Sequence, residues 1–552
     1  MSPPRVWWRH GVVYQVYPRS FQDANDDGQG DLAGITARLG YFVELGVDVV
    51  WLSPIFPSPM RDGGYDIANY VDVDPLFGTL TDFDKLLKEA HEQNIKVLLD
   101  LVPNHTSDQH PWFVNSRSSR RSDKRDWYLW ADAAPDGGPP NNWLSEFGGS
   151  AWEYDAETDQ YYYHAFLAAQ PDLNWRNPQV QRAMAEIVRF WLQRGVDGFR
   201  VDVLWHLLKD KQLRDNPPNL QFKDGDPPYR RLLPQYTTDL PEVHDAVSML
   251  RRVIDEFPDR LMIGEVYLPI KQLVAYYGRD LRGAHLPFNF ALLETPWGAA
   301  ALARVIEDYE AALPEGGWPN WVLGNHDRPR LVSRIGTEQI RVAAMLLLTL
   351  RGTPTIYYGE EIGMREAVIP PDRLRDPIGD SIAGLRYGRD SVRTPMQWDA
   401  SRFAGFSIVD PWLPIADAAA GANVAAQREY PTSILNLYRR LIATRRASPA
   451  LLDGAYRTVM VRSNLFVFAR IETSERMLIV LNLGSEAVVA DPGANVWKGT
   501  IAVSTVADRD GEVVAGSIML RAHEGVVVRL DSESKLLSTP LPADRQPSRR
   551  RN

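Results

Sequence analysis

The stretch QVQRAMAEIVRFWLQRGVDGFRVDV (residues 179–203) decides the fold. Its first part has apolar residues at helical spacing and predicts an amphipathic helix over 179–195. A short apolar run, DGFRVDV (197–203), follows and is typical of a buried parallel strand. A carboxylate, Asp202, stands at the end of that run. One helix and one strand joined in this way form the repeating unit of an α/β protein.

The same kind of apolar run recurs along most of the chain. Between most of these runs lie amphipathic stretches such as TDFDKLLKEAHEQN (81–94). Eight strand–helix units predict an α/β fold, a closed (β/α)8 TIM barrel. The eight expected strands are 11–17, 47–52, 95–102, 197–203, 261–267, 285–290, 320–325 and 354–359.

The repeat is interrupted after the third strand and ends near residue 455. Residues 104–175 are rich in Trp, Tyr, Asn and Gly and are too long for a simple loop, so we expect an inserted subdomain after strand 3. Alternating patterns such as VMVRSNLFVFARI predict a C-terminal antiparallel β-sandwich. The predicted organisation is a barrel in two parts (1–103 and 176–454), the insertion (104–175), a C-terminal β-domain (455–533) and a disordered tail (534–552).

Three acidic residues stand at the ends of predicted barrel strands: Asp202 in GFRVD, Glu265 in LMIGEVY and Asp327 in VLGNHDRPR. A single acid of this kind is commonly a helix cap or half of an ion pair. In a parallel barrel, however, the carboxyl ends of all strands open onto one face, where the chemistry occurs. Converging carboxylates suit glycoside cleavage, in which one attacks or stabilises the sugar and another protonates the leaving oxygen.

Composition narrows the possible partners. The net charge of −10 makes nucleic acid or an anionic membrane an unsuitable partner. The chain has no cysteine, which excludes disulfides and thiolate chemistry. The sequence has neither an apolar signal core nor a run of about 20 apolar residues, so we expect a cytoplasmic protein.

Six motifs follow one another along the chain: DLVPNHTS (100–107), QPDLNW (170–175), GFRVD (198–202), GEVY (264–267), NHDRPR (325–330) and RTPMQW (393–398). In this order they resemble the α-amylase superfamily of glycoside hydrolases, and within it the oligo-1,6-glucosidase and α-glucosidase branch. The resemblance implies that Asp202 is the nucleophile, Glu265 the general acid and base, and Asp327 a stabiliser of the transition state. An oligosaccharide is then the expected partner.

The resemblance also implies a glucose pocket. Arg200 lies two residues before Asp202, on the same face of a strand, and its charge should keep the nucleophile ionised. Asp62 and Arg393 are both expected to bind the hydroxyls at the non-reducing end of the substrate and to close the pocket there. A closed pocket implies an exo-acting enzyme, which removes one glucose at a time. The other expected contacts are Tyr65, which stacks on the sugar, His105 and His326, which bind its hydroxyls, and Phe166 in the pocket wall.

The segment DANDDGQGD (23–31) alternates oxygen ligands with a glycine turn. This pattern is typical of a loop that binds a hard cation, although the bidentate Glu of an EF-hand is missing. A polar turn without metal is the alternative. The resemblance implies structural Ca²⁺ or Mg²⁺ held by Asp23, Asn25, Asp27, the carbonyl of Gln29, and Asp31, and no organic cofactor.

Val203, directly after the nucleophile, accompanies preference for α-1,6 over α-1,4 links in the branch that the chain resembles. One alternative shares the same site: a glucosyltransferase or isomerase, with sucrose or maltose as donor, in which a sugar hydroxyl replaces water. A more remote alternative is a non-catalytic binding protein with this fold, since transporter-associated members of the superfamily have lost catalytic acids.

Overall fold

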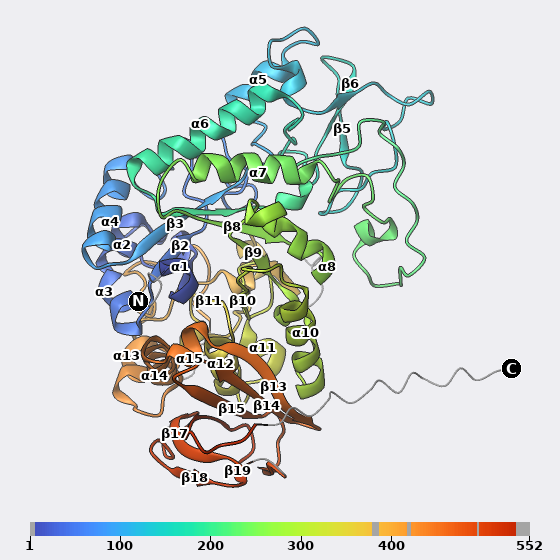
Figure 1. Cartoon of the computed structure of the whole chain (residues 1–552). Coiled ribbons are helices and arrows are strands. Elements are labelled where there is room, and N and C mark those ends of the chain that lie inside the picture. The colour runs from blue at the N-terminus through green and yellow to red at the C-terminus, as the bar shows by residue number, and fades with distance from the viewer. Residues whose placement is uncertain (1–5, 378–385, 417–420, 494–495, 537–552) are drawn as a thin grey trace, which may run out of the picture.

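The computed structural model describes residues 6–377, 386–416, 421–493 and 496–536. Eight parallel strands form its central sheet in the order β10-β11-β1-β2-β3-β7-β8-β9 (Figure 1). Strands β9 and β10 lie next to each other and nearly close the barrel. The predicted fold class is therefore confirmed. The strands are β1 (Val13–Val16), β2 (Val49–Leu52), β3 (Lys96–Leu101), β7 (Gly198–Val201), β8 (Leu261–Val266), β9 (Leu286–Asn289), β10 (Asn320–Val322) and β11 (Thr353–Tyr357).

Helices surround the barrel, and their ends follow local sequence signals. Asn177 caps α6, a proline occupies its first position, and Gly195 ends the helix with a φ of 110°. Thr79 and Asp82 form a capping box at the start of α4. The helices of the barrel layer are α2 (Leu32–Ala37), α3 (Leu39–Leu45), α4 (Leu80–Glu92), α6 (Pro178–Arg194), α7 (Val243–Ile254), α10 (Ala299–Ala312), α11 (Leu331–Ile335) and α12 (Ile340–Thr349).

The insertion after β3 forms a small subdomain. It contains α5 (Pro111–Arg117) and a three-stranded antiparallel sheet of β4 (Trp130–Ala131), β6 (Gln160–Tyr163) and β5 (Trp152–Asp155). Trp143, Trp152 and Tyr163 build its own core, which explains why the insertion is rich in aromatic residues. The subdomain and the C-terminal domain lie at opposite ends of the barrel (Figure 1).

The C-terminal domain contains a six-stranded antiparallel sheet and a two-stranded sheet. The run VMVRSNLFVFARI is two strands rather than one, because the chain turns at Ser463, whose φ is 46°. The predicted tail beyond Leu536 lies outside the described residues. Helices α13 (Val424–Glu429), α14 (Ile434–Ala447) and α15 (Pro449–Asp453) precede this domain, and α14 packs against α12 and α3 of the barrel layer. The strands of the domain are β13 (Ala455–Arg462), β14 (Leu465–Ile471), β15 (Arg476–Asn482), β16 (Val488–Ala490), β17 (Lys498–Ser504), β18 (Val513–Ala515), β19 (Ile518–Leu520) and β20 (Gly525–Leu530).

Among the helices of the described residues, none combines the length and the apolar character that crossing a bilayer requires. The expected cytoplasmic location stays a prediction.

Candidate active site

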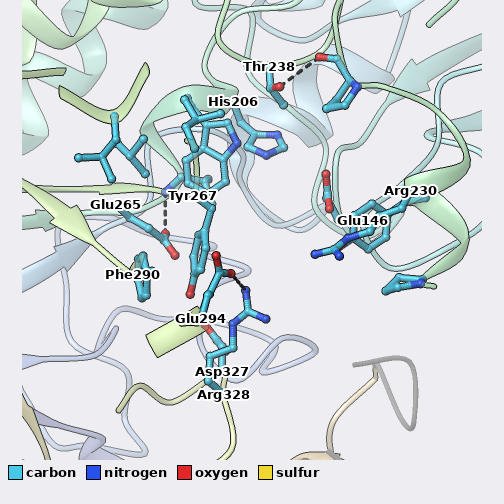
Figure 2. Close-up of a pocket in the computed structure, with 18 of the residues that line it drawn as sticks. Glu146, His206, Arg230, Thr238, Glu265, Tyr267, Phe290, Glu294, Asp327 and Arg328 are labelled. Atoms are coloured by element: carbon cyan, nitrogen blue, oxygen red, sulfur yellow. Dashed lines mark hydrogen bonds and ion pairs between the residues drawn. The ribbon is translucent and has the colours of Figure 1, made fainter. Parts of the chain in front are cut away.

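A cavity of about 830 Å³ opens at the carboxyl ends of the barrel strands. All three acids singled out from the sequence, Asp202, Glu265 and Asp327, line this cavity. Asp202 directly follows β7, Glu265 lies in the last part of β8, and Asp327 lies in the segment that follows β10. Figure 2 shows Glu265 and Asp327 with the residues that face them. The barrel thus brings together carboxylates that are far apart in the sequence.

Arg200 is the buried centre of the acidic cluster. Its Nη1 donates to Asp202 Oδ1 at 2.7 Å and to Asp100 Oδ1 at 2.8 Å, and its Nη2 lies 2.8 Å from Glu265 Oε2. The parallel register of β3 and β7 aligns Asp100 with Arg200, so the contact between these two residues follows from the sheet itself. One guanidinium therefore holds the carboxylates of Asp202 and Glu265 in a fixed relation to each other.

Asp202 and Glu265 lie next to each other at Arg200. Burial raises the pKa of Asp202 well above its usual value, and the charge of Glu265 and a hydrogen bond to it raise it further, while Arg200 opposes the shift. Adjacent buried carboxyls do not both ionise readily, and such a setting suits chemistry that needs both a nucleophile and an acid.

Val203 supports this pair through its backbone. Its N–H donates to Glu265 Oε2 at 2.9 Å. The residue has φ 36° and ψ 49°, a left-handed conformation that is unusual for a β-branched side chain. Such strain costs about 1–3 kcal/mol and is characteristic of functional sites.

Asp327 lies among positive and polar groups. Arg393 Nη2 donates to its Oδ1 at 2.6 Å, and Arg389 Nη1 lies 3.4 Å from the same atom. Burial alone would raise the pKa of Asp327, but His326, Arg393 and Arg389 together lower it. Asp327 is therefore held in its ionised form by its cationic neighbours, in contrast to Asp202, whose pKa is raised.

Arg389, and not Arg393, is the partner of Asp62. Arg389 Nη2 donates to Asp62 Oδ1 at 2.6 Å and to Asp376 Oδ1 at 2.7 Å. Gln170 donates to the other oxygen of Asp62 at 2.9 Å. Arg393 contacts Asp327 rather than Asp62, and the expectation that Asp62 and Arg393 together bind the non-reducing end stays a prediction. Asp62 and Arg389 line the cavity, whereas Arg393 is not among the lining residues.

Tyr65 and His326 form a hydrogen-bonded unit beneath the acids. The Tyr65 hydroxyl lies 3.0 Å from Asp100 Oδ2 and 2.8 Å from His326 Nε2. The other ring nitrogen of His326 lies 2.8 Å from Gln15 Nε2. Tyr65 lines the cavity, but His326 and Arg200 do not, so these two residues position the acids from behind.

His105 and Phe166 lie side by side in the cavity wall, with ring centroids 5.2 Å apart. Nε2 of His105 lies 3.1 Å from Gln170 Nε2, and its Nδ1 lies 3.1 Å from Asn104 Nδ2. Burial lowers the pKa of His105, which keeps the imidazole neutral. Gln170, the first residue of QPDLNW, thus connects His105 to Asp62, a role that its sequence position did not reveal.

This geometry coincides with a family match. The sequence profile described as "Alpha amylase, catalytic domain" matches residues 15–454, which include the barrel and the whole cavity. The chain belongs to the alpha-amylase family. It is 46% identical to the "Probable alpha-glucosidase" of Rhizobium meliloti (strain 1021), over 89% of this chain and 92% of that protein. It is 38% identical to the "Oligo-1,6-glucosidase" of Parageobacillus thermoglucosidasius, over 88% and 92% respectively.

Solved structures of the alpha-amylase family agree. An "alpha-glucosyl transfer enzyme, XgtA" superposes with a TM-score of 0.89 at 39% identity, covering 96% of this chain and 100% of the other. A mutant of the isomaltulose synthase from Erwinia rhapontici NX5, in complex with sucrose, has a TM-score of 0.88 at 33% identity, with the same coverage. The chain is an enzyme, a glycoside hydrolase, and the alternative of a non-catalytic binding protein is not supported.

The loop 23–31 lies apart from the cavity. Asp23 accepts hydrogen bonds from the N–H of Asp26 and Gly28, both at 2.8 Å, and Asp31 accepts one from Gly34 at 2.6 Å. Within the described ranges, no group of three or more His, Cys, Asp or Glu side chains is placed to hold a metal ion. Asp23 and Asp31 are nonetheless buried carboxylates, which also accept hydrogen bonds from N–H and hydroxyl groups. Carboxylate oxygens are ligands that hard cations prefer, so the residue types of this loop fit such an ion.

Proposed function

We propose that this enzyme is an exo-acting, retaining α-glucosidase that releases glucose from the non-reducing end of short α-glucosides. One observation carries the proposal: a single buried guanidinium joins Asp202 and Glu265 at the base of a cavity that Asp327 also lines. Direct attack on the sugar needs two carboxyls with no room for a water between them, at about 5–5.5 Å.

The proposed reaction has two steps. In the first, an oxygen of Asp202 bonds to the anomeric carbon while the glycosidic bond breaks, and Glu265 gives its proton to the leaving oxygen. In the second, Glu265 takes a proton from water, the water oxygen bonds to the anomeric carbon, and Asp202 is released. Asp327 binds hydroxyls of the distorted sugar, most strongly in the transition state.

The proposal of exo action rests on the closed side of the cavity. The Asp62–Arg389 pair, held by Gln170 and Asp376, forms a rigid polar wall that offers both acceptors and donors to the terminal hydroxyls of glucose. A substrate that extended past this wall would have to break a buried ion pair, which is costly. Glucose at the end of a chain satisfies the wall without breaking it.

The linkage and the acceptor are the finer parts of the proposal. Val203 favours α-1,6 links slightly over α-1,4 links, and relatives named for both α-glucosidase and oligo-1,6-glucosidase activity leave both open. A second candidate is transfer of glucose to a sugar instead of water. It is favoured by the structural similarity to an α-glucosyl transfer enzyme and to an isomaltulose synthase.

Glucose release by the purified enzyme from isomaltose, maltose, sucrose and starch, with all products resolved by chromatography, tests the proposal. We expect the enzyme to release glucose from the disaccharides and to turn over little starch. Asp202→Asn and Glu265→Gln should each lose the release of glucose from the disaccharides. New oligosaccharides in place of glucose would favour the second candidate. Internal cleavage of starch into long fragments would contradict exo action.

We further propose that loop 23–31 binds a structural Ca²⁺ or Mg²⁺. Oxygens of Asp23, Asn25, Asp27 and Asp31, together with the carbonyl of Gln29, would hold the ion. Such an ion neutralises clustered carboxylates and fixes the loop. It takes no part in the proposed reaction, because the loop does not line the cavity.

A further inference from the structure

The cavity extends beyond the reacting acids to a second polar wall. On this far side lie Glu146, from the inserted subdomain, and Tyr229 and Arg230, from the short helix η4 (Pro228–Arg231). Figure 2 shows Glu146 and Arg230 across the cavity from Glu265. Two chain segments that are distant in sequence therefore face the same space.

The neighbours of Glu146 define which part of the cavity it faces. The adjacent Phe147 packs edge-on against Phe166, with centroids 5.5 Å apart, and the guanidinium of Arg389 lies 5.4 Å from the Phe147 ring. Phe147 thus completes the wall of the glucose pocket. Glu146 directly precedes Phe147, and its N–H donates to Ala165 O at 2.9 Å, which fixes the backbone at this position of the wall.

Two polar groups on this wall have unused hydrogen-bonding capacity. No hydrogen bond to the carboxylate of Glu146 is found from any described residue, and Arg230 acts on it only as a nearby charge. Nδ1 of His206, a residue that is 3% exposed and also lines the cavity, has no partner among the described residues. Burial raises the pKa of Glu146 to about 7, and the charge of Arg230 opposes this shift. Glu146 is half-buried in the cavity wall, whereas His206 is buried. A buried polar atom without a partner is uncommon, so Nδ1 of His206 points to a ligand that supplies the missing bond.

Glu294, also in the cavity wall, provides a contrast. Its carboxylate lies 3.3 Å from Nη2 of Arg328, and the Arg328 guanidinium in turn lies over the Tyr267 ring. The carboxylate of Glu294 therefore has an ion-pair partner within the protein. The carboxylate of Glu146 accepts no hydrogen bond from the described residues.

We propose that Glu146 determines specificity for the leaving group: its carboxylate accepts hydrogen bonds from the hydroxyls of a sugar or polyol aglycone, and His206 assists. The inference rests on the proposed glucosidase function and deepens it. A carboxylate presents two acceptor oxygens and suits adjacent hydroxyls of one sugar ring. An aromatic aglycone without hydroxyls gains nothing from this contact.

A comparison of two substrates of the purified full-length enzyme tests the proposal. For Glu146→Leu, we expect kcat/KM for the best disaccharide substrate to fall about 10- to 100-fold, the range for one hydrogen bond to a charged group. For 4-nitrophenyl α-glucoside, kcat/KM should stay within about threefold of wild type because this aglycone does not use the bond. Glu146→Gln, which keeps one acceptor, should lose less on the disaccharide. The matched control is Glu153→Gln, an exposed acid of the same subdomain.

Each other outcome overturns the inference in a recognisable way. Equal losses on both substrates would assign Glu146 to folding or to the chemical step, and unchanged disaccharide cleavage in Glu146→Leu would remove any role in recognition. If the wild-type enzyme cleaved neither substrate, the proposed function itself would fail and this inference with it. Thermal melting of each variant distinguishes loss of fold from loss of a contact.

Discussion

Replacing Arg200 by lysine tests whether its forked geometry, rather than its charge, organises the site. Arg200 makes contacts of 2.7 to 2.8 Å with Asp202, Asp100 and Glu265. A lysine keeps the positive charge but presents one nitrogen, which cannot occupy both guanidinium positions. We expect at least one, and as many as two, of the three contacts to be lost.

The size of the effect follows from those contacts. A hydrogen bond between charged groups contributes about 1.5–3 kcal/mol, so losing one or two weakens transition-state binding by about 1.5–6 kcal/mol. Since about 1.4 kcal/mol corresponds to a factor of ten, kcat should fall between about 10- and 10,000-fold, with a central value near 100- to 1,000-fold. The assay is steady-state release of 4-nitrophenol from 4-nitrophenyl α-glucoside, alongside thermal melting.

Arg445→Lys is the matched control. Arg445 is equally buried but donates to the backbone oxygens of Leu348 and Leu350, outside the cavity. This control should lower the melting temperature and leave kcat within about threefold. Near-wild-type kcat in Arg200→Lys, or an equal loss of kcat in Arg445→Lys, would refute the reasoning.

Three further predictions concern the glucose pocket, a buried acid and the loop. Arg389→Lys should raise KM for disaccharides at least tenfold, because the lysine cannot reach both Asp62 and Asp376; an unchanged KM would contradict this. Burial raises the pKa of Glu360 from about 4.5 to about 7, so the folded protein binds this proton more tightly than the unfolded chain does. The stability that this difference contributes is complete below about pH 4.5 and is lost as the pH rises to about 7. Glu360→Gln should therefore melt about 2–3 °C higher relative to wild type at pH 8 than at pH 5, and a pH-independent difference would contradict this. A chelator should lower the melting temperature of the wild-type enzyme but not of Asp23→Ala, and added Ca²⁺ or Mg²⁺ should restore it; equal responses would exclude the loop.

The sequence predicted the barrel because its signal is local and repeated. Each strand is an apolar run of a few residues, and each is followed by a stretch with helical spacing, so eight units could be counted without knowing any long-range contact. The three acids were found for the same reason, since Asp202, Glu265 and Asp327 all stand at the ends of such runs.

The pocket wall could not be predicted in the same way. Arg389 and Asp62 are 327 residues apart, and Arg389 lies in an irregular segment with no periodic pattern. Arg393, four residues later in a recognisable motif, was predicted to bind the sugar with Asp62, whereas Arg389 was not singled out. The left-handed backbone of Val203 was equally hidden, because a β-branched residue gives no local signal for a positive φ.

Trapping of the covalent intermediate tests the central claim most directly. The wild-type enzyme would be incubated with 5-fluoro-α-D-glucosyl fluoride, digested with protease and examined by tandem mass spectrometry. We expect one fluoroglucosyl group per chain, attached to the side chain of Asp202, and no label in Asp202→Asn. A label on Glu265, or turnover that first releases β-glucose without any covalent adduct, would contradict the assignment of Asp202 as the nucleophile.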